Sequence, residues 1–136
     1  KSAGTVTGNL TTCAENLPDI AVAPPLQFGG PGDEWSPEDL LMASISNCLV
    51  LSFRAIARVS KLEWISIECV SDGELDKVKR KVQFTNIMSK IRLFIPTTES
   101  KEKAEKLLNK AESACLISNS LSCESRIECE VVFSGE

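Results

Sequence analysis

The chain has 136 residues, of which 43% are apolar, and it carries a formal net charge of -4 with six cysteines and no histidine. This length suffices for one sizeable core, so we expect a single domain over residues 1–136. The acidic balance and the aromatic content of 5% argue against nucleic acid and membrane surfaces as partners. The absence of histidine excludes Ser-His-Asp and Cys-His catalysis, which leaves cysteine, carboxylate, lysine, arginine or hydroxyl chemistry.

The first part of the chain combines a predicted hairpin with a loop. Apolar and polar residues alternate over residues 4–23 around the turn-like sequence ENLPD at 15–19, which predicts two strands. Residues 24–37 then contain four of the six prolines and three of the seven glycines, a composition typical of an ordered loop. A linker is the weaker alternative, because the roughly 20 residues before it are too few for a stable domain.

A long helix is predicted over residues 37–60. Ser36 suits the N-cap, Pro37 the first helical position, and Asp39 follows three residues after the cap, as in a capping box. Its apolar residues cover nearly the whole circumference, unlike the single stripe of a surface helix, so we expect a central, buried helix. These residues are Leu40, Leu41, Met42, Ile45, Cys48, Leu49, Val50, Leu51, Phe53, Ile56 and Val59.

Three strands and a second helix follow. Residues 64–71 and 124–133 alternate with period two, which predicts half-buried strands. Residues 82–95 form a third strand, and because its apolar parity changes we expect a bulge near Thr85. A charged hairpin tip, DGELDKVKRK, precedes it, and residues 98–115 show the spacing of an amphipathic helix. This order predicts an α+β fold with antiparallel sheets around a central buried helix.

The function classes that remain depend on the cysteines. No signal-peptide pattern and no run of about 20 apolar residues is visible, so we expect a cytoplasmic protein whose cysteines are mostly thiols. A metal site is not expected, because the chain has neither a CxxC motif nor histidine. The ordinary interpretation of a free cysteine is a small buried hydrophobe, which suits the strand positions Cys69 and Cys129. Cys48 and Cys115 each lie on the apolar side of a helix and could form a redox pair.

Two stretches resemble a known family. The sequence FGGPGDEWSPEDLLMASISNC at residues 28–48 is similar to the central signature of the osmotically inducible protein C and organic hydroperoxide resistance (OsmC/Ohr) family. The sequence ACLISNSL at residues 114–121 resembles its second cysteine motif. The spacing of the two motifs and the element order match over most of the chain.

The resemblance implies a cofactor-free, thiol-dependent peroxidase that reduces organic hydroperoxides as an intertwined homodimer. By motif position Cys48 corresponds to the peroxidatic cysteine and Cys115 to the resolving one, while Glu38 matches a supporting glutamate that positions an arginine beside the thiol. An external dithiol, such as a lipoyl-type one, would reduce the disulfide. No arginine precedes Arg54, so a cation would have to come from elsewhere. The partner subunit's hairpin with Lys77, Lys79, Arg80 and Lys81 is one candidate, and a merely solvated tip is the alternative.

A substrate pocket is expected around Cys48. Its predicted walls are almost entirely apolar, which would favour bulky organic hydroperoxides over hydrogen peroxide. They are Leu41, Ile45, Leu49, Ser52, Leu108 and Ala111. The alternative function is a small-molecule-binding or stress protein of the same fold without peroxidase activity, in which the thiols are incidental.

Overall fold

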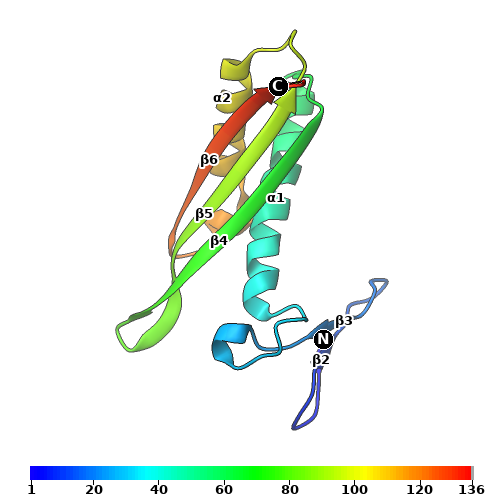
Figure 1. Ribbon diagram of the computed structural model, residues 1–136, viewed down its shortest axis with the longest axis vertical. Coiled ribbons are helices and arrows are strands. Elements are labelled where there is room, and N and C mark those ends of the chain that lie inside the picture. Colours follow the sequence, from blue (N-terminus) through cyan, green and yellow to red (C-terminus); the bar gives the residue numbers. More distant parts are fainter. Residues whose placement is uncertain (136) are drawn as a thin grey trace. The chain divides into compact units, whose positions relative to one another are not determined.

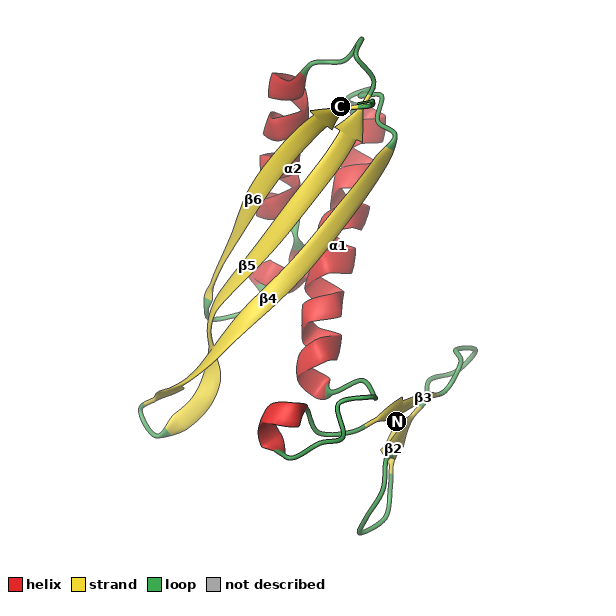
Figure 2. Cartoon of the chain, in the orientation of Figure 1, coloured by secondary structure: helices red, strands yellow, loops and turns green. Residues whose placement is uncertain are grey.

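The order of elements in the computed structural model, which describes residues 1–135, follows the predicted order. The chain divides into two units, Lys1–Met42 and Ala43–Glu136. Helix α1 (Pro37–Val59) begins in the first unit and continues into the second. The expectation of an α+β fold is confirmed, with two three-stranded sheets and helices between strands (Figures 1 and 2).

The first unit contains the predicted hairpin. Strands β2 (Leu10–Thr12) and β3 (Ile20–Val22) pair antiparallel, and a short strand β1 (Ser2–Ala3), which the sequence did not reveal, extends the sheet. The predicted loop then includes one 3-10 turn, η1 (Leu26–Phe28).

The N-terminus of α1 has the predicted capping box. The Ser36 hydroxyl oxygen accepts a hydrogen bond from the Asp39 backbone N–H at 3.0 Å. The Asp39 carboxylate in turn accepts the Ser36 N–H at 3.2 Å and the Ser36 hydroxyl at 2.8 Å. Because Ser36 is fully buried, these reciprocal bonds satisfy polar groups that water cannot reach and fix where the helix begins.

The second unit contains a sheet of three long strands in the order β4-β5-β6. Strands β4 (Ser66–Val78) and β5 (Lys81–Ile95) form an antiparallel hairpin, and β6 (Glu124–Phe133) lies on the other side of β5. The register shifts between Glu74 and Leu75 so that Thr85 has no opposite residue, which confirms the predicted bulge.

One prediction about this sheet is wrong, because β6 runs parallel to β5 rather than antiparallel. The segment between them holds α2 (Lys101–Ala114) and a short helix α3 (Leu116–Asn119), which brings the chain back to the end where β5 began. A helical crossover of this kind joins parallel neighbours, whereas a tight turn would join antiparallel ones.

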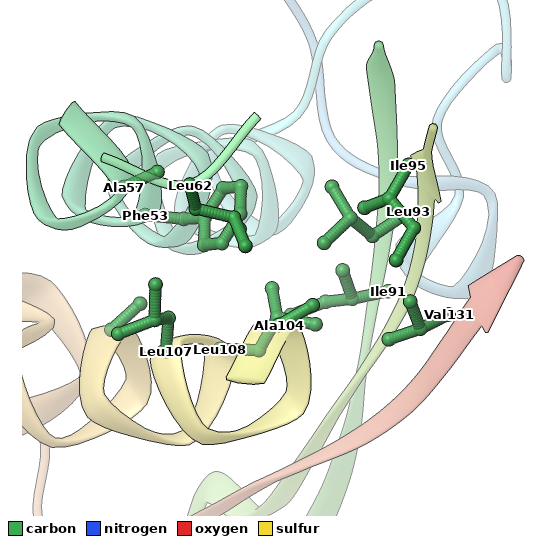
Figure 3. Close-up of a cluster of buried hydrophobic side chains, with 11 residues drawn as sticks. Phe53, Ala57, Leu62, Ile91, Leu93, Ile95, Ala104, Leu107, Leu108 and Val131 are labelled. Carbon is green, nitrogen blue, oxygen red and sulfur yellow. The ribbon is translucent and has the colours of Figure 1, made fainter. Parts of the chain in front are cut away.

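The core of the second unit lies between the helices and one face of the sheet (Figure 3). Phe53 and Ala57 of α1 face Leu107 and Leu108 of α2, and Ile91 of β5 closes the layer. The predicted apolar stripe of α2 is buried, while the alternate positions Cys69 and Cys129 pack against the core from the sheet.

The prediction that α1 would be buried on every side is wrong for the single chain. Its buried residues form one stripe, whereas Leu51 and Val59 are 56% and 81% exposed. The expectation that no segment could span a membrane also needs correction, since α1 is long and apolar enough by length and composition. The core helix of a soluble protein passes the same test, and part of α1 packs in the core described above.

Candidate active site

Cys48 lies in the middle of α1, at the border of its buried stripe. The residues on either side of it in the stripe, Ile45 and Leu49, are fully covered, and Cys48 itself is half-buried. Ser52 follows one helical turn later on the same side, as residues four apart do in an α-helix. The helix thus holds a thiol and a hydroxyl next to each other at the edge of a packed core.

Cys115 is positioned by the junction of two helices. It ends α2 and precedes α3 with an extended backbone (φ -67°, ψ 104°), and it is completely buried. The Ser118 hydroxyl donates a hydrogen bond to its Sγ at 3.2 Å, and its backbone N–H donates to the Glu112 carbonyl at 3.1 Å. These contacts on both sides of the residue fix the direction of the thiol.

The structure brings Cys48 and Cys115 together. Their side chains are within hydrogen-bond range of each other, although they are 67 residues apart in sequence, and both are free thiols. The Cys48 sulfur also accepts from the Ser52 side chain and the backbone N–H groups of Ile117 and Leu116. The first two residues after Cys115 therefore contribute backbone donors, and Cys115 itself contributes the second thiol.

These donors change the acidity of Cys48. Partial burial raises the pKa of this thiol, but hydrogen bonds from Ile117, Cys115, Ser52 and Leu116 together outweigh burial, so the pKa is lowered. A hydrogen bond donated to sulfur stabilises the thiolate more than the thiol. Because the thiolate is the nucleophile, the site favours attack by Cys48 at lower pH than an ordinary cysteine would allow.

Cys69 and Cys129 lie in a different environment in the same unit. They flank Ile91 on one row of the sheet and face the core. Burial raises the pKa of the Cys69 thiol, and hydrogen bonds from Ser46 and Ser71 offset this only in part. Burial also raises the pKa of Cys129 to about 11, with a further contribution from the negative charges of Glu105 and Glu112. Both thiols should be inert near neutral pH.

The comparison with known proteins assigns the family. Residues 30–130, which span most of the chain, match the family described as OsmC-like protein. The chain belongs to the OsmC-like family. The expectation drawn from the two cysteine motifs is thereby confirmed at the level of family and fold.

Relatives of known sequence or structure agree with this assignment. The chain is 27% identical to the uncharacterised protein YmaD of Bacillus subtilis, over 98% of this chain and 87% of that protein. An OsmC-like protein of unknown function from Vibrio cholerae superposes with a TM-score of 0.83 at 22% identity, covering 90% of this chain and 84% of that one. A structure from Legionella pneumophila, described as an organic hydroperoxide resistance protein OsmC, gives 0.75 at 25% identity over 96% and 93%.

Most of the residues expected to line the substrate pocket are buried in the single OsmC-like chain. Of its six predicted wall residues, four are fully buried: Ile45, Leu49, Leu108 and Ala111. They contribute to the interior, because the apolar periodicity that selected them marks the core face of each helix. Exposed apolar surface near the thiol comes instead from Leu51, three residues after Cys48 on α1 and 56% exposed, and from Leu116, which is 69% exposed.

Sequence reasoning missed the donors around Cys48. The sequence predicts Ser52 only as a wall residue, and it gives no indication that the backbone groups of Leu116 and Ile117 are donors. Backbone donors carry no signature in side-chain chemistry, so only the position of these residues directly after the second cysteine could have suggested them. The one donor that the sequence could have indicated is the Ser52 hydroxyl, because it lies four residues, or about one helical turn, after Cys48.

The remaining predicted groups belong to other elements of the chain. Glu38 belongs to the first turn of α1, in the first unit, and one of its carboxylate oxygens is buried without a hydrogen-bond partner within residues 1–135. Lys77, Lys79, Arg80 and Lys81 are exposed around the β4–β5 turn. Over the same described range, no group of three or more His, Cys, Asp or Glu side chains could hold a metal ion.

Proposed function

We propose that this OsmC-like chain is a thiol-dependent peroxidase that reduces organic hydroperoxides to alcohols through Cys48 and Cys115. The observation that supports this most is the contact between a half-buried thiol of lowered pKa and a second, fully buried thiol. The structure from Legionella pneumophila described as an organic hydroperoxide resistance protein, at 25% identity, supports the same activity.

The reaction would begin with the Cys48 thiolate. Its sulfur attacks the distal oxygen of the peroxide, the O–O bond breaks, and the alkoxide takes up a proton and leaves as the alcohol. Cys48 is then a sulfenic acid. The backbone N–H of Ile117 and the side chain of Ser52 lower the pKa of Cys48 and so stabilise the thiolate that begins the reaction.

Cys115 would complete the cycle. Its sulfur attacks the Cys48 sulfur, a disulfide forms, and the hydroxyl group leaves as water with the Cys115 proton. An external dithiol, such as a lipoyl-type one, then reduces the disulfide by exchange and becomes a disulfide itself, so two electrons pass from the dithiol to the peroxide. The burial of Cys115 keeps small oxidants from reaching it before Cys48.

The proposal includes a homodimer in the cytoplasm. Leu51 and Val59 leave apolar surface of α1 exposed in the single chain, and a partner subunit would cover it. Sedimentation at micromolar concentration should give about twice the mass of one chain, which is 14.8 kDa. A mass near that of one chain would contradict the dimer.

A coupled assay tests the activity. With cumene hydroperoxide as substrate and dihydrolipoamide as reductant, the wild-type chain should consume both in equal amounts. Peptide mapping after oxidation should find Cys48 joined to Cys115 within one chain. No turnover, or a main disulfide that contains Cys69 or Cys129, would refute the proposed mechanism.

A further inference from the structure

The basic residues of this acidic chain are concentrated at one turn. Residues 76–83, which we call the basic tip, hold four of the 15 lysines and arginines and one of the 19 acidic residues. They therefore carry a formal charge of +3, which leaves -7 for the rest of the chain. The acidic balance argues against anionic partners for the chain as a whole, but this argument does not apply to the basic tip. Its cations are Lys77, Lys79, Arg80 and Lys81.

The basic tip is the end of a two-stranded ribbon. β6 begins at Glu124 opposite Asn86, so beyond this point only β4 and β5 pair, and their hairpin projects from the sheet (Figure 1). All residues of the basic tip are exposed. Within the described part of the chain no ion pair includes one of its cations, although Arg92 of the same strand β5 pairs with Glu130 at 3.3 Å. In the single chain the four cations are therefore open to an external partner.

The turn of the basic tip has an unfavourable backbone. Val78 pairs with Lys81, so Lys79 and Arg80 form a two-residue turn, and their φ angles are 48° and 71°. Turns with positive φ at both positions favour the sequence Asn-Gly, because a Cβ is disfavoured in left-handed backbone. The Lys-Arg sequence makes the hairpin less stable and places two positive charges at its end. Strained backbone of this kind is often found at functional positions.

Two exposed valines lie among the cations. Val78 is opposite Lys81 on one face of the ribbon and Val82 is opposite Lys77 on the other, so each face has an apolar side chain beside a basic one. The exposed fractions are 36% for Val78 and 61% for Val82. A nucleic acid would use only the cations, since the basic tip has no aromatic side chain on which a base could stack. A surface of anionic lipid would use both kinds of side chain, because the cations meet the headgroups and the valines enter between them.

We propose that the basic tip binds reversibly to membrane surfaces that contain anionic phospholipid. Each Lys or Arg near such a surface strengthens binding about fivefold, so the four cations together contribute roughly two to three orders of magnitude. The attraction extends over about one Debye length, which is about 8 Å at physiological ionic strength, so added salt weakens it. The binding is peripheral, because two valines within a charged turn are far fewer than the apolar residues of a membrane-spanning segment.

Co-sedimentation of the full-length protein with lipid vesicles tests the proposal. Vesicles of about 30% phosphatidylserine in phosphatidylcholine are the probe, and vesicles of phosphatidylcholine alone are the control. We expect binding to the anionic vesicles to be at least about a hundredfold stronger, and to weaken as salt is added. Equal binding to both kinds of vesicle, or no binding to the anionic ones, would overturn the proposal.

A double variant separates the charges from the stability of the turn. Lys79→Asn with Arg80→Gly supplies the sequence that this turn favours, so the hairpin should be at least as stable while binding to anionic vesicles falls about 25-fold. Lys106→Gln with Lys110→Gln removes the same charge from exposed positions of α2 and should leave binding unchanged. Thermal unfolding measures the stability of each variant. Unchanged binding in the first variant, or an equal loss in the second, would overturn the proposal.

The valines distinguish a membrane from a soluble polyanion. Val78→Ser with Val82→Ser should weaken binding to anionic vesicles at least about fourfold, the contribution of one buried CH₂, and leave the salt dependence unchanged. Unchanged binding in this variant would overturn the assignment to a membrane. Tighter binding of a short single-stranded oligonucleotide than of the anionic vesicles would overturn it as well.

The basic tip could instead meet acidic residues of a second copy of the chain. In that case Lys79→Asn with Arg80→Gly would lower the mass of the assembly in sedimentation without lipid, an outcome that overturns the proposal. We expect the mass to stay unchanged. Because vesicle binding and mass are measured without a peroxide, a failure here leaves the proposal for Cys48 and Cys115 untouched, and the reverse holds as well.

Discussion

Two pairs of cysteines in the second unit show how differently one fold can treat the same side chain. Cys48 is half-buried, as are Cys69 and Cys129, yet the pKa of Cys48 is lowered and those of the two strand cysteines are raised. Burial acts in the same direction on all three, because it disfavours the thiolate. The difference comes from what surrounds the sulfur.

The surroundings are set by secondary structure. The Cys48 sulfur accepts hydrogen bonds from the backbone N–H groups of Leu116 and Ile117, at the start of α3, and from the Ser52 hydroxyl one turn along α1. Cys129 lies on β6, where burial raises its pKa and the carboxylates of Glu105 and Glu112 raise it further. A thiol therefore becomes more acidic in this fold where nearby donors outweigh burial, as they do at Cys48 and not at Cys69.

Replacing single thiols should give the largest difference in the rate of peroxide turnover. Cys48→Ser should reduce peroxide turnover to the rate of the reaction without protein, because a hydroxyl is not ionised at neutral pH. The matched replacement Cys129→Ser removes a thiol of the same unit whose pKa is about 11, and it should keep nearly the full rate. Consumption of cumene hydroperoxide with a dithiol measures both. Full activity in Cys48→Ser would contradict the claim that the reactive thiol is Cys48.

Removal of the second thiol should separate the two steps of the reaction. Cys115→Ser keeps Cys48 and should permit one oxidation, after which sulfenic acid accumulates and turnover stops unless an added thiol resolves it. Trapping with dimedone, followed by mass spectrometry, measures the sulfenic acid on Cys48. Continued turnover with a dithiol that cannot reach Cys48 would show that Cys115 is not the resolving residue.

The pH dependence of alkylation should rank the thiols. The rate of iodoacetamide labelling follows the thiolate, so Cys48 should reach its plateau at lower pH than a free cysteine, and Cys69 at higher pH. Near pH 8 roughly one Cys129 thiol in a thousand is ionised, since its pKa is about 11. Mass spectrometry of each cysteine peptide gives the profiles, with urea-unfolded protein as the reference for access. The same pH profile of alkylation for Cys48, Cys69 and Cys129 in the folded protein would contradict the predicted differences between their pKa values.

The smallest expected effect concerns the hydroxyl of Ser52. Ser52→Ala removes one donor to the Cys48 sulfur, so the pKa of Cys48 should rise. A hydrogen bond to a charged group is worth about 1.5–3 kcal/mol, but the less acidic thiolate is also the better nucleophile, so the oxidation rate should fall by about tenfold or less. Ser113→Ala, which removes an exposed hydroxyl on α2, is the control and should change neither the pKa nor the rate. An unchanged pKa of Cys48 in Ser52→Ala would show that the Ser52 hydroxyl does not stabilise the thiolate.

Sequence patterns predicted the elements better than the site. The capping box at Ser36, the bulge at Thr85 and the stripe of α2 all depend on local spacing, which the sequence states directly. The parallel pairing of β6 depends on where a helical crossover ends, and the donors of Leu116 and Ile117 are backbone groups, so neither has a residue signature. The apolar periodicity around Cys48 identified core residues and not the exposed Leu51 and Leu116.

The central proposal is that Cys48, a thiol of lowered pKa, reduces organic hydroperoxides. Stopped-flow oxidation of the reduced protein, by cumene hydroperoxide and by hydrogen peroxide in separate runs, tests it most directly. Leu51 and Leu116 offer exposed apolar surface beside the thiol, and each buried CH₂ is worth about 0.8 kcal/mol, so a substrate with three or four more buried carbons should react about two orders of magnitude faster. We expect that preference, together with loss of the fast phase in Cys48→Ser. Equal rate constants for the two peroxides, or a fast phase that persists without Cys48, would contradict the account.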